Sequence, residues 1–136
     1  MILHRDGLLV LEYDIASDVL YVSWPDLSGF SMDEIQYSFQ KFIEAIKSYD
    51  VKRLLLDSSK TRVDASYEDY KTLMLELSTG FLGTRLERIA RVRAEDNMRE
   101  QLVQQFIQEI VVDPQFSIPY QDFASVQDAL DWLCRK

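Results

Sequence analysis

Residues 53–59, RLLLDSS, are the most informative stretch of the chain. The leucines at 54–56 form an apolar run without alternation, which is typical of a strand covered on both faces in the middle of a sheet. Asp57, Ser58 and Ser59 then end the run with polar side chains. We therefore predict that this stretch is the central strand of an α/β sheet and the end of that strand.

The chain before this stretch predicts a hairpin followed by a helix. Apolar and polar residues alternate over residues 9–15 and again over 19–24, which is the period of half-buried strands joined by a short turn. Ser31 and Glu34 have the spacing of a capping box, in which each residue bonds to the backbone of the other. We predict that a helix begins there and ends near residue 50.

Helices and strands alternate from this stretch to the end of the chain. The second helix is predicted to begin at Ser66 and to stop at Gly80. The third helix is predicted to bury a stripe with four-residue spacing, made of Met98, Leu102, Phe106 and Ile110. The remaining elements are a strand over 88–92, an edge strand over 117–120 that contains Pro119, and a closing helix over 125–133 that Ser125 and Asp128 begin.

The complete order of predicted elements is β-β-α-β-α-β-α-β-α, and it fills residues 1–136 as one domain. Right-handed crossovers make the later strands parallel, and the first hairpin adds an antiparallel strand at the other edge. We therefore predict an α/β fold with a mixed, mostly parallel sheet of five strands. A chain of this length buries roughly two thirds of its unfolded surface, so it needs no disulfide or metal to fold.

The composition of the chain limits the binding partners and the cellular compartment that we expect for the protein. The chain has 15 basic and 23 acidic residues and a net charge of −8, so its field repels the phosphates of nucleic acids and anionic membranes. Its apolar runs are far too short for a membrane span. Cys134 is the only cysteine, and no signal-peptide pattern opens the chain. We expect a cytoplasmic protein that binds no nucleic acid and does not insert into a membrane.

The order of elements, the opening hairpin, the segment 53–59 and the closing helix with Ala129 and Trp132 resemble the SpoIIAA-like family. These proteins are relatives of the STAS domain of anti-sigma factor antagonists and share a fold with lipid-binding Sec14-type domains. The resemblance covers essentially the whole chain and implies a non-catalytic regulatory or protein-interaction module. In the antagonist branch, a serine after the central strand accepts phosphate from a kinase. The resemblance implies Ser66, or Ser58 after its aspartate, as the phosphoacceptor.

The carboxyl end of the predicted central strand carries a candidate anion site. Open α/β sheets place ligands at this end, and free amides at the start of a helix attract anions. Ser58, Ser59 and Arg62 follow the central strand, and Ser66 begins the next helix. Arg91 and Arg93 project from one face of the next strand, and Arg93 lies at its carboxyl end. The hypothesis is an anionic or amphipathic ligand, such as a nucleotide or a lipid-like molecule. In the alternative interpretation, the polar residues cap a loop and the arginines make surface ion pairs.

The chain gives little support for catalysis. His4 is the only histidine and lies in a terminal segment, so neither a Ser-His-Asp arrangement nor a histidine metal site is expected. Cys134 lies two residues from the end and cannot head a phosphate-binding loop. We predict no catalytic residue, no metal and no cofactor, and we do not expect an enzyme.

Two functions from different classes remain open. The first is a protein-interaction module that binds a partner protein or its own copy as a homodimer, through an edge strand or an aromatic helix face around Phe81. The second is a binder of small molecules at the carboxyl end of the sheet. An enlarged apolar cavity would favour the second function.

Overall fold

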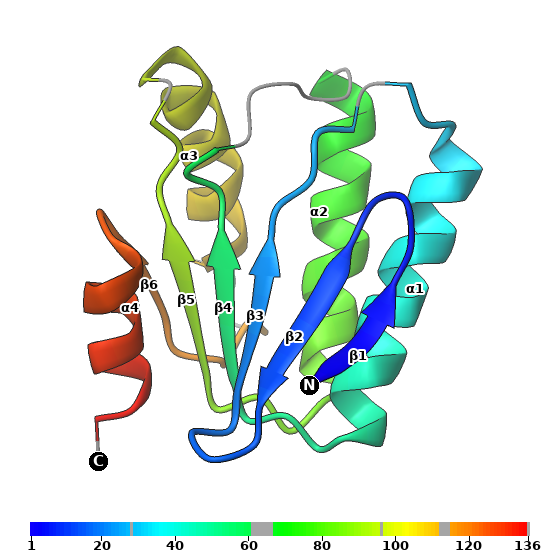
Figure 1. The fold of residues 1–136 in the computed structure, drawn as a ribbon. Coiled ribbons are helices and arrows are strands. Elements are labelled where there is room, and N and C mark those ends of the chain that lie inside the picture. Colours follow the sequence, from blue (N-terminus) through cyan, green and yellow to red (C-terminus); the bar gives the residue numbers. More distant parts are fainter. Residues whose placement is uncertain (28, 61–66, 96, 112–114, 136) are drawn as a thin grey trace.

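The computed structural model of the protein describes residues 1–27, 29–60, 67–95, 97–111 and 115–135 (Figure 1). These residues form four helices and one sheet of six strands. In chain order the elements are β1 (Ile2–Arg5), β2 (Val10–Asp14), β3 (Val19–Ser23), α1 (Met32–Ser48), β4 (Arg53–Asp57), α2 (Tyr67–Leu82), β5 (Arg88–Val92), α3 (Asn97–Val111), β6 (Tyr120–Phe123) and α4 (Val126–Leu133).

The strands lie in the sheet in the same order as in the chain, from β1 to β6. β1, β2 and β3 are antiparallel neighbours, whereas β3, β4, β5 and β6 run parallel. The α/β class and the mixed, mostly parallel sheet are confirmed. The predicted count of five strands is wrong, because residues 2–5 add β1 at the edge. This segment is only four residues long and pairs with β2 in an irregular register, so it has no alternation from which to predict it.

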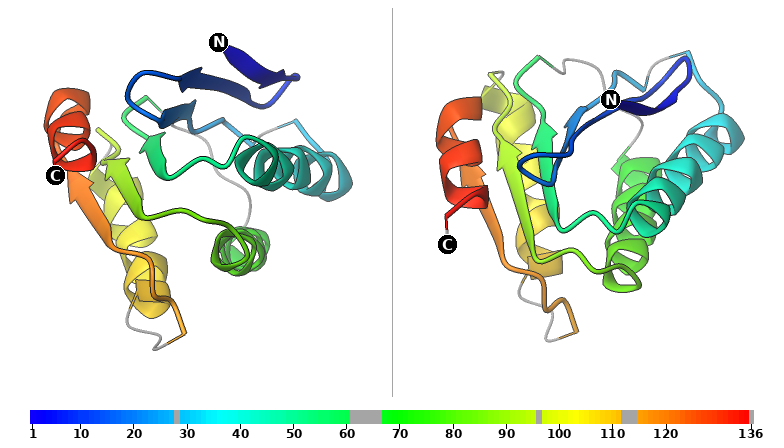
Figure 2. Two further views of the ribbon diagram at one scale, coloured as in Figure 1. Left: turned by 90° about the horizontal axis from the view of Figure 1, so that it is seen from below. Right: turned by 60° about the horizontal axis from the view of Figure 1, so that its bottom comes forward.

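The prediction for the central strand is confirmed. β4 lies between β3 and β5, and Leu54 and Leu55 are both fully buried. Leu54 belongs to the core on the face covered by α1, α2 and α3, whereas Leu55 belongs to the core under α4 (Figure 2). Consecutive residues of a strand point to opposite faces, so both faces of β4 need apolar side chains.

The face that carries α4 is only partly covered. α4 packs on β4, β5 and β6, and no described helix lies in front of β1 and β2 in Figure 1. Ile2 and Glu12 are paired across these two strands, and both are exposed. We call this surface, formed by β1 and β2 on the side of α4, the open half-face.

Two predicted helix starts are confirmed. The Ser31 hydroxyl accepts a hydrogen bond from the backbone N–H of Glu34, and the Glu34 side chain accepts one from the backbone N–H of Ser31. At α4, the Ser125 hydroxyl accepts from the backbone N–H of Asp128. Each bond satisfies an amide that has no partner inside the helix. The predicted cap at Ser66 lies outside the described residues.

Helix α2 does not stop at Gly80 as predicted, but continues to Leu82. Gly80 instead marks a close approach of two helices, because a Cβ built on it would lie 2.9 Å from Cδ1 of Ile43 in α1. A glycine therefore serves helix packing here rather than helix termination.

The buried stripe of α3 differs from the predicted one. Of the predicted members, Phe106 is buried, whereas Met98 is 83% exposed and Leu102 is 42% exposed; Ile110 lies outside the residues whose burial the structure describes. Val103 and Ile107 are buried beside Phe106 instead. A strict four-residue spacing drifts by about 40° per step around a helix of 3.6 residues per turn, so it leaves the buried face within two turns.

The last strand is β6 over residues 120–123, not 117–120. Pro119 lies just before it, and its carbonyl accepts a hydrogen bond from the backbone N–H of Ile89. The predicted position at an edge of the sheet is confirmed. Of the helices described, none has the length and the apolar composition that a membrane crossing requires.

Candidate binding site

A pocket with a volume of about 70 Å³ lies between α2, α3 and the sheet, and we call it the α2–α3 pocket. Its wall is almost entirely apolar, and it is partly open to solvent. An engineered cavity of roughly 150 Å³ holds benzene in another protein. The α2–α3 pocket has a smaller volume than that cavity, so a benzene-sized ligand would extend from the pocket into its mouth. The lining residues are Trp24, Leu56, Ser58, Met74, Leu77, Ser78, Phe81, Ile89, Arg91, Ile107, Phe116 and Tyr120.

The pocket follows from the period of the strands and helices around it. Leu56 and Ser58 are two residues apart on β4 and its carboxyl end, and Ile89 and Arg91 have the same spacing on β5, so all four lie on one face of the sheet. Helix α2 contributes residues at helical spacing, of which Ser78 is the smallest. Ser78 therefore leaves space that a larger side chain would fill.

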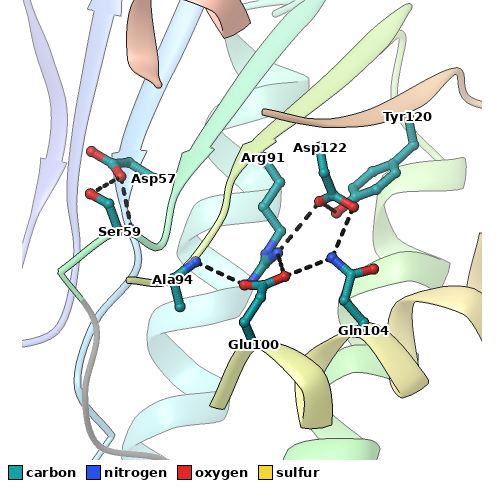
Figure 3. Close-up of polar contacts among 8 residues, drawn as sticks. All are labelled: Asp57, Ser59, Arg91, Ala94, Glu100, Gln104, Tyr120 and Asp122. Carbon is teal, nitrogen blue, oxygen red and sulfur yellow. Dashed lines mark hydrogen bonds and ion pairs between the residues drawn. The ribbon is translucent and has the colours of Figure 1, made fainter. Parts of the chain in front are cut away.

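A buried ion-pair cluster borders the pocket at β5, β6 and α3 (Figure 3). Nη1 and Nη2 of Arg91 donate to the two carboxylate oxygens of Glu100 at 2.9 and 2.8 Å, and Nη1 also donates to Asp122 at 3.4 Å. The side chains of Arg91 and Glu100 are only 5% and 13% exposed. We call Arg91, Glu100 and Asp122 the Arg91 triad.

Neutral donors hold the two acids of the Arg91 triad in place. The Gln104 amide donates to Glu100 at 2.6 Å and to Asp122 at 3.0 Å. The Tyr120 hydroxyl donates to Asp122 at 2.7 Å, and the backbone N–H of Ala94 donates to Glu100 at 2.8 Å. A buried charge pair is stable only when its remaining polar atoms are satisfied in this way.

The pKa values of the charged and phenolic groups in the cluster are shifted away from neutral pH. Burial opposes the charge of Arg91, but the hydrogen bonds and charge of Glu100 raise the Arg91 pKa above its ordinary value. Burial opposes the charge of Glu100 too, yet the bonds from Arg91 and Gln104 lower its pKa. Burial and the charge of Asp122 raise the pKa of Tyr120 well above its usual range. Arg91, Glu100 and Tyr120 therefore keep their protonation states near neutral pH.

Ser58 is the predicted site residue that the structure places in the pocket. It is 4% exposed, and its hydroxyl makes no hydrogen bond with any described residue. Its backbone N–H donates to the carbonyl of Val92. A hydroxyl that is buried in this way lies out of reach of a kinase, so this conformation does not favour Ser58 as the phosphoacceptor.

The other predicted site residues do not join Ser58 in the pocket. The Ser59 hydroxyl donates to Asp57 at 2.6 Å, and Asp57 also accepts from the Tyr21 hydroxyl at 2.5 Å. Figure 3 shows Asp57 and Ser59 well apart from the Arg91 triad. Arg93 is exposed. Arg62 and Ser66 lie outside the described residues, so the predicted anion site stays a prediction.

Sequence reasoning missed Tyr120 as a site residue. It considered Arg91 as an anion contact or, in the alternative, as part of a surface ion pair, whereas its ion pair is buried. The available signal was the position of Arg91 between Ala90 and Val92 in an apolar strand, because an arginine there requires a buried acid. Nothing local identifies Glu100 and Asp122 as the partners, since they follow at nine and 31 residues.

Comparisons of the chain with models of protein families, with curated proteins and with solved structures find no match. The resemblance to the SpoIIAA-like family therefore stays a prediction. Within the described part of the chain, no group of three or more His, Cys, Asp or Glu side chains is arranged to hold a metal ion.

Proposed function

We propose that the protein is a non-catalytic binding domain that takes up a small, mainly apolar molecule in the α2–α3 pocket. The observation that carries this proposal is an apolar wall combined with Ser58, a residue only 4% exposed whose hydroxyl makes no hydrogen bond with any described residue. Ligand sites are typically apolar pockets with a few convergent polar groups.

The protonation states near the pocket support binding rather than acid–base catalysis. A general acid or base works best when its pKa lies near the working pH. The pKa values of Arg91, Glu100 and Tyr120 are all shifted away from neutrality, by burial and by their mutual hydrogen bonds. The cluster therefore shapes and supports the pocket without exchanging protons with a ligand.

The test is titration of the isotope-labelled protein with toluene, a small neutral apolar molecule, followed by NMR, in the wild type and in two variants of α2. Ser78→Leu fills the pocket, whereas Thr79→Leu adds the same side chain on the exposed side of the helix. Both native hydroxyls donate to the carbonyl of Leu75, so the two variants lose the same hydrogen bond.

Ser78→Leu is expected to weaken toluene binding about tenfold or more, and Thr79→Leu should leave it within about twofold. Absence of binding in the wild type, or equal binding by all three proteins, would contradict the proposed function. Thermal melts of the variants establish that each is folded.

A second proposed function is self-association, which the open half-face favours. Met1, Ile2 and Ile15 are exposed at the end of this surface, where Met1 bonds to Tyr13 of β2. Exposed apolar side chains that gather at a sheet edge are typical of contact surfaces. The earlier expectation that Phe81 forms such a surface is wrong, because Phe81 is buried against Phe42.

Light scattering tests this second proposal. The wild type is expected to give the mass of a dimer at tens of micromolar, and the double variant Ile2→Ser, Ile15→Ser should give that of a monomer. Leu102→Ser is the control, because Leu102 is an exposed apolar residue on α3, away from this surface. A wild-type monomer would overturn self-association and leave the pocket proposal intact.

A further inference from the structure

The charges around the α2–α3 pocket favour an uncharged ligand over an anion. Among the described residues that line the pocket, Arg91 is the only one with a formal charge. That charge is already matched by two acids, since Arg91 is bound to both Glu100 and Asp122. One positive and two negative charges leave the Arg91 triad with a formal charge of −1.

The donors of Arg91 are also largely occupied. Three of its N–H groups serve the acids of the triad, out of five that a guanidinium carries. A ligand carboxylate would have to compete with Glu100, which Gln104 and the Ala94 backbone hold in place. It would also lose its hydration against an apolar wall, beside two like charges. An anion is therefore disfavoured by charge, by occupied donors and by desolvation.

A neutral polar group has a partner in the pocket. Ser58 is only 4% exposed and lines the pocket, and a serine hydroxyl both donates and accepts hydrogen bonds. It therefore suits a ligand alcohol, which does both, as well as a carbonyl, which only accepts. Met74, Leu77 and Ile107 supply apolar contact for the rest of such a ligand.

We propose that the α2–α3 pocket selects an uncharged ligand, with an apolar body between α2 and α3 and one hydroxyl or carbonyl group bound to Ser58, and that it rejects the corresponding carboxylate. This inference rests on the proposed function of the pocket, and it narrows the ligand class from anionic or amphipathic to neutral.

The experiment compares matched pairs of small molecules by NMR titration of the isotope-labelled protein, residues 1–136, near neutral pH. The pairs are benzyl alcohol with benzoate, and pentanol with pentanoate. Each alcohol is expected to shift the amide signals of Leu77, Ser78 and Arg91 and to bind about tenfold or more tightly than its acid. A carboxylate that binds as tightly as its alcohol would overturn the inference.

Two variants test whether the triad causes the selectivity. Asp122→Asn removes one negative charge from the triad, and Asp131→Asn removes one from the exposed side of α4. The first is expected to improve benzoate binding about threefold or more and to leave benzyl alcohol within about twofold. The second should change neither. Equal improvement by both variants would show that the overall charge acts instead of the triad, and would overturn the inference.

Ser58→Ala provides a readout that does not depend on the fold of an Asp122 variant. This variant should weaken benzyl alcohol about threefold or more while leaving toluene, which has no polar group, unchanged. An equal effect on both molecules would overturn the role of Ser58. Absence of binding by every alcohol and by toluene would instead remove the proposed function of the pocket. The two failures are therefore distinguishable.

Discussion

Helix α2 is packed differently on its two sides. Toward α1, Gly80 allows so close an approach that a Cβ would lie 2.9 Å from Ile43, and Phe81 meets Phe42 edge-on with ring centres 5.8 Å apart. Toward α3, the same helix lines a pocket of about 70 Å³. A glycine brings two helices together on one side, whereas apolar side chains on the other leave space beside a buried charge cluster. The α1 side also borders an open groove, but Gln36, Glu44 and Glu76 are part of its lining, whereas the space on the α3 side is lined mainly by apolar side chains.

The largest loss of folding stability is expected when the charge cluster on the α3 side of α2 loses its arginine. Arg91→Ala leaves the carboxylates of Glu100 and Asp122 buried without their cation, which typically costs about 3–5 kcal/mol. Urea denaturation measures the loss. Arg93→Ala is the control on the same strand end, because Arg93 is exposed, and it should change stability by less than about 0.5 kcal/mol. Similar losses for both variants would contradict the assigned role of the triad.

The next effect is expected on the α1 side. Gly80→Leu places a side chain where Ile43 lies, so the Ile43 side chain or the two helices must shift, and overpacking of this kind costs about 1–3 kcal/mol. Ile43→Ala in the same chain makes room for the added side chain, so the double variant should recover about 1 kcal/mol or more relative to Gly80→Leu. Thermal and urea denaturation of the single and double variants measure this coupling. Additive losses would show that the two helices do not meet at this point.

The features of the fold differ in how far they could be predicted from the sequence. The central strand at Leu54 and Leu55 and the caps at Ser31 and Ser125 were predictable, because each rests on a local pattern whose physical cause lies within a few residues. The close approach at Gly80 was not, because a glycine inside a helix has the same local pattern whether it ends the helix or packs against another.

The candidate site was predictable only in part. Ser58 was identified because the carboxyl end of a central strand is a known place for ligands. The pocket itself depends on the distance between α2 and α3, and on the pairing of Arg91 with acids from α3 and β6. These contacts join residues far apart in the chain, so no local pattern contains them. The drift of the α3 stripe shows the same limit, because which face of α3 is buried was set by packing against α2 and β6.

A smaller loss of stability is expected when the Asp6 carboxylate, which accepts a hydrogen bond from α1, is replaced. Asp6 accepts hydrogen bonds from His4, from Ser38 of α1 and from the backbone N–H groups of Leu8 and Leu9. Burial opposes its charge, but these bonds lower its pKa below the ordinary value of 3.8. A lowered pKa in the folded state means that the stabilisation is present above that ordinary value and is lost as the pH falls through the folded value.

Asp6→Asn is therefore expected to cost about 1–2 kcal/mol at neutral pH and to flatten the loss of stability in acid. Thermal melts from neutral pH to about pH 2 measure both effects. Asp33→Asn is the control, because Asp33 is exposed in the first turn of α1, and its acid dependence should match that of the wild type. An unchanged pH profile in Asp6→Asn would show that Asp6 does not link the β1–β2 connection to α1.

The smallest change in stability is expected from filling the pocket, and it is a gain rather than a loss. Ser78→Leu adds apolar volume on the α3 side of α2, only two residues from Gly80. Because the pocket has space there, the added side chain removes apolar surface from water without displacing a neighbour, and such filling commonly stabilises a protein by about 0.5–1 kcal/mol. Urea denaturation of Ser78→Leu beside Gly80→Leu then compares the same side chain on the two sides of one helix. A gain for the first and a loss for the second is the expected result. Losses of equal size would mean that α3 packs against α2 as tightly as α1 does, and that the space beside Ser58 is too rigid to admit a ligand.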